Sequence, residues 1–389
     1  MVELPSKAQV LRAIHERGPI SRSAVAEQTG VSLSSVSLIA RDYIAAGLIE
    51  ETGTKKQGLG RPSIMLAVRS SAACFLGADV SDFRLVAVLS DLSGQVLGTR
   101  TRELDTADPG KIASLLARMK NDLLQQAGLP EERLVGAGFS LSGLVDAERG
   151  ICLHSTVLGW RNVRIRELLE AALDLPVALE NDANCVAMGE KLYGGQHVRD
   201  RDFAVMSVGQ GIGCGLIVNG RLFQGHHGVT GEIGHCTAVP DGPVCRCGKR
   251  GCVEAVAGTP AILRAAADAG LEADSLGRLE ELAVHEPAAA DILTQAGRAL
   301  GLGLSHLVNI FSPELVVVTG SGDRLGPVLR SALQDGLERN ILPLLPAPPE
   351  LVFQDKDETV WARGAASLAA EAFIKNGGDP ADHRGTARL

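Results

Sequence analysis

Residues 235–252 restrict the folding of this chain more than any other segment, because they bring metal-binding side chains close together. Within 18 residues the segment contains one histidine and three cysteines, namely His235, Cys245, Cys247 and Cys252. Thiols and an imidazole at such spacing are typical of a tetrahedral Cys3His zinc site. Because four ligands close the coordination sphere, the zinc is expected to be structural, shaping the loop without taking part in chemistry.

The same cysteines have a second interpretation, as reduced thiols buried like small hydrophobic side chains. Arg246, Lys249 and Arg250 make the segment polar, however, and buried cysteine would be unusual there. Cys236 is a candidate replacement for one ligand, although in an extended segment its side chain points away from that of His235. The chain has no secretory signal and no apolar run of the roughly 20 residues that span a bilayer, so we expect a cytoplasmic protein with reduced cysteines and no membrane partner.

The first part of the chain carries the pattern of three short helices followed by a hairpin. Apolar residues recur at helical spacing over 6–17. Ser21 is a candidate cap for a second helix and Ser32 for a third, with a glycine turn between these two helices. Strand-like segments at 48–50 and 64–68 follow, joined by a polar stretch. This order predicts an α+β winged helix-turn-helix.

Charge separates this module from the rest of the chain. Residues 1–69 have a net charge of +3, whereas the whole chain has −8, which leaves −11 for the remainder. A basic module joined to an acidic body suits a protein that meets nucleic acid phosphates at one end only. We therefore predict that the third helix and the wing contact double-stranded operator DNA, through Ser34, Ser35, Ser37, Arg41, Lys55, Lys56 and Arg61. The alternative is a three-helix protein-interaction module with a solvated basic hairpin.

Beyond residue 70 the pattern changes to strands, and one order of elements occurs twice. The first set has strands at 74–80, 83–90 and 95–103, a helix at 109–127 and a strand at 134–140. The second set has strands at 203–208, 214–218 and 221–224, a long helix at 287–311 and a buried strand at 315–319. Two copies of one α/β unit predict two lobes with a cleft between them, which is the usual place for a small ligand.

Polar side chains suited to a ligand occur in three short segments. Asn181 and Asp182 follow a predicted strand at its carboxyl end, where ligand sites of α/β proteins open. Asp182 could equally be a simple helix cap. Glu232 and His235 precede the metal loop, and Glu254 follows it. Carboxylates, an amide and an imidazole together offer the acceptors and donors that sugar hydroxyls require.

Together these residues resemble the ROK family, named for its repressors, open reading frames and kinases. The pattern Cys-x-Cys-Gly-x-x-Gly-Cys-x-Glu over 245–254 is the most specific match, and 231–235 and 180–184 match further family motifs in order and distance. The similarity extends from about Lys7 to about Ala370 and is closest to the repressor branch, which includes xylose and N-acetylglucosamine repressors. It implies a two-lobed actin-like or hexokinase-like ATPase fold.

The resemblance also implies roles for individual residues. In kinases of the family, the residue matching Asp182 accepts the proton of the attacking sugar hydroxyl. The residues that hold the sugar there match Asn181, Glu232, His235 and Glu254. His235 would then bind zinc and position the sugar through different ring nitrogens.

Two turns argue against kinase activity. Kinases of the family carry Asp-x-Gly-Gly-Thr after the first strand, whereas this chain has Asp-Val-Ser-Asp-Phe at 79–83. In the glycine-rich turn at 209–213, Gln210 stands where the kinases usually have threonine. Phosphoryl transfer depends on positioning and charge stabilisation, so we predict no enzymatic activity and interpret Asp182 as a vestigial base that hydrogen-bonds an effector.

These observations predict a sugar-responsive repressor of carbohydrate genes, in which a monosaccharide or a derivative closes the cleft and changes operator affinity. The predicted domains are a winged helix-turn-helix at 1–70, a first lobe at 71–185, a second lobe at 186–375 whose last helix packs on the first, and a disordered tail at 376–389. We expect a homodimer or homotetramer, because winged-helix proteins usually meet two half-sites. The alternatives are an ATP-dependent sugar kinase with an appended DNA-binding module and a zinc-folded scaffold that binds neither ligand.

Overall fold

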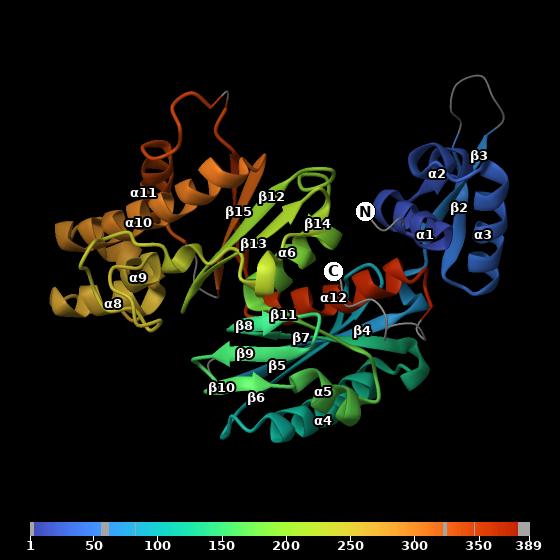
Figure 1. Ribbon diagram of the computed structural model, residues 1–389, viewed down its shortest axis with the longest axis horizontal. Helices are drawn as coiled ribbons and strands as arrows, with labels where there is room; N and C mark the ends of the chain where they lie inside the picture. Colours follow the sequence, from blue (N-terminus) through green and yellow to red (C-terminus); the bar gives the residue numbers. More distant parts are fainter. Residues whose placement is uncertain (1–3, 56–61, 82, 322–324, 346, 380–389) are drawn as a thin grey trace. The chain divides into compact units, whose positions relative to one another are not determined.

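The computed structural model describes residues 4–55, 62–81, 83–321, 325–345 and 347–379 (Figure 1). The chain forms two compact units, Met1–Asn181 with Trp361–Leu389, and Asp182–Val360. It therefore passes from the first unit to the second after Asn181 and returns after Val360. Among the described residues, no helix combines the length and the apolar composition needed to cross a membrane.

The N-terminal module of the first unit contains the three predicted helices and a small antiparallel sheet. The helices are α1 (Ser6–Arg17), α2 (Arg22–Thr29) and α3 (Leu33–Ala45), and the sheet has the order β1 (Ile20–Ser21), β3 (Ser63–Val68), β2 (Ile49–Lys55). Both predicted caps form: Ser21 Oγ accepts from the backbone N–H of Ala24 at 3.3 Å. Ser32 Oγ accepts from that of Ser35 at 3.1 Å. This is the element order of a winged helix-turn-helix, with the β2–β3 hairpin in the place of the wing.

The C-terminal helix α12 (Val360–Lys375) contacts this module. Glu371, whose side chain is 2% exposed, pairs with Arg12 of α1 at 2.9 and 3.2 Å. The Tyr43 hydroxyl of α3 lies 2.9 Å from the carbonyl oxygen of Gly377. Residues 376–379, which the sequence assigns to a disordered tail, therefore include a defined contact, while 380–389 lie outside the described residues.

The larger part of the first unit is built on a five-stranded sheet of order β11-β7-β4-β5-β6. Its strands are β4 (Cys74–Ser81), β5 (Arg84–Asp91), β6 (Val96–Glu103), β7 (Leu134–Leu141) and β11 (Val177–Asn181). Helices α4 (Pro109–Ala127) and α5 (Ile165–Leu173) share a core with one face of this sheet. Helix α12 lies on the other face, against Gly77 and Gly138 (Figure 1). A separate small sheet contains β8 (Leu144–Asp146), β9 (Ile151–Ser155) and β10 (Trp160–Val163).

The second unit has a five-stranded sheet of order β14-β13-β12-β15-β16. Its strands are β12 (Phe203–Val208), β13 (Ile212–Val218), β14 (Arg221–Leu222), β15 (Leu315–Ser321) and β16 (Glu350–Lys356). Helix α6 (Asp182–Tyr193) packs closely on one face, where its Ala183 and Ala187 meet glycines of β13. The other face shares a core with α7 (Val253–Ala257), α8 (Thr259–Asp268), α9 (Leu276–Leu282), α10 (Pro287–Phe311) and α11 (Pro327–Glu338).

The two large sheets have the same connectivity. In each, the first strand of the set pairs with the second in a hairpin, the second pairs with the third, and the strand after the long helix lies parallel to the first. The repeat predicted from the sequence is therefore confirmed. The repeated unit places the carboxyl ends of β4 and β12 in corresponding positions, each followed by a turn and a returning strand.

Candidate metal and ligand site

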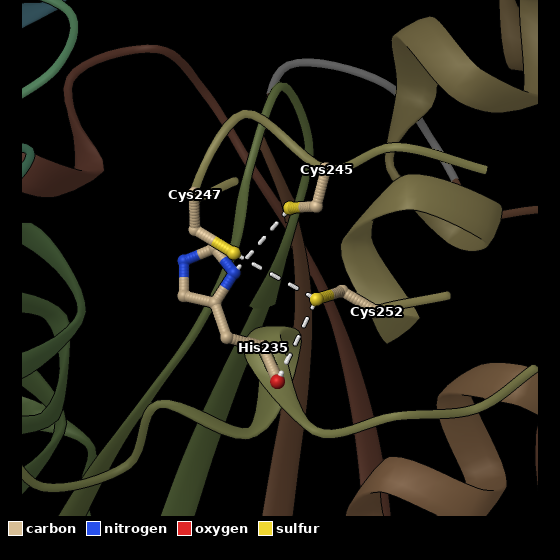
Figure 2. Close-up of side chains that lie close together, drawn as sticks. All are labelled: His235, Cys245, Cys247 and Cys252. Atoms are coloured by element: carbon tan, nitrogen blue, oxygen red, sulfur yellow. Dashed lines mark hydrogen bonds between the residues drawn. The ribbon is translucent and has the colours of Figure 1, made fainter. Parts of the chain in front are cut away.

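Four metal-binding side chains come together in the second unit (Figure 2). His235 ends the 3-10 helix η4 (Ile233–His235), Cys245 and Cys247 lie in the following loop, and Cys252 directly precedes α7. One ligand atom from each of the four lies within 4.8 Å of the others. Cys236, the alternative ligand, is outside this group and packs half-buried against the apolar core.

The separations match tetrahedral coordination. Cys247 Sγ is 3.8 Å from Cys252 Sγ, and Cys245 Sγ is 3.6 Å from His235 Nδ1. Metal–sulfur bonds of about 2.3 Å and metal–nitrogen bonds of about 2.0 Å at tetrahedral angles give S–S edges of about 3.8 Å and S–N edges of about 3.5 Å. The group can therefore hold a metal ion of this coordination with little rearrangement.

The segment before the metal loop places Glu232 next to His235. Gly231 has φ +79°, and a Cβ there would overlap the carbonyl oxygen of Cys214 in β13. Glycine thus lets the segment press against the strand. Glu232 Oε2 then lies 3.8 Å from His235 Nε2, on the side of the ring opposite to the Nδ1 that faces Cys245. The two ring nitrogens of His235 therefore face different partners.

Glu254, a predicted sugar ligand, is held by the metal loop itself. Its side chain is 8% exposed and pairs with Arg246, with Nε 2.8 Å from Oε1 and Nη2 2.9 Å from Oε2. The backbone N–H of Ile212 donates to Oε2 at 3.2 Å. Our reading of the sequence missed Arg246 and treated it only as a polar loop residue. The available signal was its place between two metal-ligand cysteines, which restrains its backbone.

Asp182, Glu232 and Glu254 form an acidic group within the second unit. Burial, together with the negative charges of Asp182 and Glu254, raises the pKa of Glu232 to about 7, although Arg246 opposes the rise. Burial lowers the pKa of His235, which favours the neutral imidazole that a metal ligand requires. Glu232 therefore lies near both Asp182 and Glu254, and it faces His235 at 3.8 Å.

Asn181, the fifth predicted sugar-binding residue, belongs to the first unit. It ends β11, and its Nδ2 donates to the carbonyl oxygen of Gly143 at 3.1 Å. Asp182, the next residue, opens α6, and its Oδ1 accepts from the backbone N–H of Ala183 at 2.8 Å. Asp182 therefore contacts the backbone at the start of α6.

The carboxyl end of β4 carries a buried aspartate. Asp79 is 1% exposed, and its two oxygens accept from Ser140 Oγ at 2.6 Å and from Ser81 Oγ at 2.8 Å. Phe83, on the far side of the turn, has φ +57° and is 54% exposed. Asp82 lies outside the described residues. The carboxylate that opens the turn is thus bound by side chains of the protein itself.

The predicted DNA-contacting residues of α3 lie on its accessible side. Ser34, Ser37 and Arg41 are exposed and Ser35 is half-buried. Ser37 Oγ donates to the carbonyl oxygen of Leu33 at 2.8 Å, and the other two serines bond to the hydroxyl of the cap. The serines are therefore held locally, which leaves Arg41 as the extended polar side chain of this set.

The three basic residues predicted to contact DNA through the wing lie at the edge of the described residues or outside them. Lys55 ends β2, and Lys56 and Arg61 lie outside the described residues. Leu33 and Leu38 of α3 are each 53% exposed and were absent from the prediction. Exposed leucines on such a helix can contact thymine methyl groups.

Two sheets of the same connectivity, one in each unit, and a Cys3His loop in the second unit make a hexokinase-like α/β fold, which a three-helix module precedes. The chain belongs to the ROK family, whose model matches residues 76–372.

Comparisons with known proteins separate two kinds of relative. The xylose repressor of Bacillus spizizenii is 27% identical over 94% of this chain and 94% of its own length. A crystal structure of a ROK family transcriptional regulator, described as a homolog of the E. coli MLC protein, is 27% identical and covers 96% of both chains with a TM-score of 0.80. A ROK family glucokinase from Streptomyces griseus, in complex with glucose and AMPPNP, is 26% identical with a TM-score of 0.64 and covers 76% of this chain and 99% of its own.

Proposed function

We propose that this protein is a sugar-responsive, DNA-binding transcriptional repressor. The observation that carries the proposal is the share of this chain that each kind of relative matches. The repressor and regulator relatives align with 94% and 96% of this chain, whereas the glucokinase aligns with 76% of it from end to end of its own length. The matched repressors therefore have a counterpart of the N-terminal module, which a kinase does not need.

The proposed effector is a monosaccharide or a close derivative, bound by Asn181, Asp182, Glu232, His235 and Glu254. Support comes from the acidic group in the second unit and from the His235 ring, whose Nε2 faces Glu232 while its Nδ1 faces Cys245. A pKa near 7 allows the Glu232 carboxyl to donate to one hydroxyl and accept from another. Sugar hydroxyls both donate and accept, so a mixed set of this kind suits them.

We propose that the metal is Zn²⁺ and that its role is structural. Three thiolates and one imidazole are a preferred donor set for zinc, and they leave no position for a reacting water. When bound, the ion would hold the loop between η4 and α7, and with it His235 and Glu254.

The kinase alternative rests on Asp182 and is opposed by the turn after β4. The serine contacts of Asp79 and the exposed Phe83 stand where the kinases have glycines and a threonine that approach phosphate. An ADP-release assay with common hexoses and pentoses distinguishes the two functions.

A response to sugar requires a link between the sugar-binding domain and the DNA-binding module. The pair between Arg12 and the buried Glu371 supports such a link, because it fixes α1 to α12 instead of leaving the module on a loose tether. We further propose a cytoplasmic homodimer or homotetramer, since paired modules meet two half-sites of an operator.

Arg41→Gln is expected to weaken binding to an operator selected from random duplexes by roughly tenfold, because a phosphate contact is removed from α3. The slope of log affinity against log salt should fall in magnitude by about one. Fluorescence anisotropy over a salt series measures both. Arg264→Gln, which removes an exposed arginine from α8 of the second unit, is the control. Equal operator affinity in the two variants would contradict a DNA-contacting α3.

Asp182→Ala is expected to abolish the sugar response while leaving operator binding intact. Losing a hydrogen bond to a charged acceptor costs about 1.5–3 kcal/mol, which is roughly a 10- to 100-fold loss of sugar affinity. The measurement is a thermal-shift screen of monosaccharides, followed by anisotropy with operator and the sugar found. Asp268→Ala, at an exposed position of α8, is the control. A normal sugar response in Asp182→Ala would remove this residue from the site.

A further inference from the structure

Leu38 is an exposed leucine in the middle of α3, on the side of the helix that faces away from the core of its module. The helix buries Val36, Ile39, Ala40 and Tyr43 in that core. Leu38 comes two residues after Val36, which is just over half a turn at 3.6 residues per turn, so the two side chains point to opposite sides. Leu38 is 53% exposed. Packing within the module therefore does not account for a leucine at this position.

The other exposed side chains of α3 surround Leu38 with polar and small groups. Besides Leu38, the exposed positions of this helix are Leu33, Ser34, Ser37, Arg41, Asp42 and Ala45. Residues three and four apart are neighbours on a helix surface, so Ser34, Arg41 and Asp42 adjoin Leu38. The Ser34 hydroxyl bonds to that of Ser32 at 3.0 Å. Leu38 and Arg41 are thus the two long side chains at the centre of this surface.

Charge indicates that the ligand of this surface is a nucleic acid. The module has a net charge of +3. Arg22 pairs with Glu51 at 2.8 Å and Arg69 pairs with Glu50 at 3.3 Å, so acidic residues of β2 offset these two arginines. In the part of the chain that the structure describes, no ion pair or side-chain hydrogen bond engages Arg41. An unpaired arginine beside an apolar side chain suits a major groove, where phosphates flank the base edges.

The apolar character of Leu38 indicates which base it meets. Thymine presents a methyl group in the major groove, whereas the other bases are distinguished there by hydrogen-bond donors and acceptors. A leucine side chain forms no hydrogen bond, so it gains affinity by covering apolar surface. We propose that Leu38 is a specificity-determining residue that packs on the 5-methyl group of a thymine in the operator, while Arg41 binds phosphate beside it. The inference rests on the proposed DNA-binding function and names a base that α3 distinguishes.

The test uses the full-length protein and the operator selected from random duplexes. Each thymine is replaced in turn by deoxyuridine, which forms the same base pair and lacks only the 5-methyl group. Fluorescence anisotropy compares the wild type with Leu38→Ala and with the control Leu168→Ala, which removes a 39% exposed leucine from α5. At one thymine position we expect the wild type and Leu168→Ala to lose roughly fourfold in affinity, the effect of exposing one methyl-sized group. Leu38→Ala should bind the unmodified operator more weakly and lose nothing further at that position.

Two readouts separate a base contact from general damage. Leu38→Ala should keep the wild-type thermal midpoint, because the side chain is exposed and alanine favours a helix. Its slope of log affinity against log salt should equal that of the wild type, because removing a leucine releases no counterion from DNA. The slope of Arg41→Gln, by contrast, should be smaller. Duplexes selected with Leu38→Ala should lose the thymine preference at the one position and keep the other base preferences.

Three results would overturn the inference. Wild-type affinity that deoxyuridine changes at no position would show that no thymine methyl group is contacted. A Leu38→Ala variant as sensitive as the wild type to deoxyuridine at the same position would assign the effect to another residue or to the shape of the DNA. A Leu38→Ala salt slope reduced like that of Arg41→Gln would indicate disturbed phosphate contacts instead. A wild-type protein that bound no duplex would overturn the proposed function itself, before any variant is compared.

Discussion

Cys252→Ser is expected to lose the bound zinc ion and to unfold at least the loop between η4 and α7, with a fall of roughly 10–20 °C in thermal midpoint. The physical reason is the size of the zinc-binding free energy relative to the stability of a domain. Structural zinc contributes ~10–16 kcal/mol of apparent folding free energy in small peptides, which is comparable to the ~5–15 kcal/mol total stability of a typical domain. A loss of even ~5 kcal/mol in a unit of this size corresponds to roughly 10–20 °C.

The matched control for this substitution is Cys236→Ser. Cys236 adjoins His235 in the chain but lies outside the metal-binding group, so its variant should keep one zinc ion and nearly the wild-type midpoint. Mass spectrometry of the native protein and differential scanning calorimetry give the two readouts, and a chelator added to the wild type should reproduce the Cys252→Ser result. Retention of zinc by Cys252→Ser, or its loss from Cys236→Ser, would mean that the ligand set is wrong.

Gly138→Ala is expected to destabilise the first unit by about 3 kcal/mol or more, a large effect for one methyl group. Gly138 lies on β7, directly opposite Gly77 of β4. A Cβ at Gly138 would overlap the carbonyl oxygen of Ala365 and lie 2.5 Å from its carbonyl carbon. Because both groups are backbone, no side-chain rotation can relieve the overlap, and α12 must move away from the sheet.

Gly136→Ala provides a control on the same strand and the same face. Its Cβ would lie 3.6 Å from Ala369 Cβ, an ordinary contact, so its free energy of unfolding should change by less than about 1 kcal/mol. Urea denaturation measures both variants. Equal stability of Gly136→Ala and Gly138→Ala would contradict the close packing of the α12 backbone on Gly138. Because Glu371 of this helix pairs with Arg12, Gly138→Ala should also weaken the response of operator binding to sugar.

The local patterns of the sequence predicted a large part of this structure. The boundaries of α1, α4, β12 and α10 match the predicted ranges, since apolar periodicity and the prolines that begin α4 and α10 act within a few residues of chain. The metal group was also predictable, because His235 and the three cysteines lie close in the chain as well as in space. The strands of β8–β10 and the polar edge strand β16 were missed, since short or edge strands carry little apolar alternation.

Within the site, the sequence by itself determined which chemical groups are available: the Cys3His ligands, the acidic residues and the glycines around them. Only the tertiary structure decided which of these groups pair with one another. Arg246 pairs with Glu254 in the second unit, and α12 packs on Gly77 and Gly138 in the first. Glu371 of α12 also pairs with Arg12 of the N-terminal module, 359 positions away in the sequence. Such pairings depend on which surfaces meet after folding. Local propensity and spacing act over short stretches of chain, so they cannot specify contacts between distant segments.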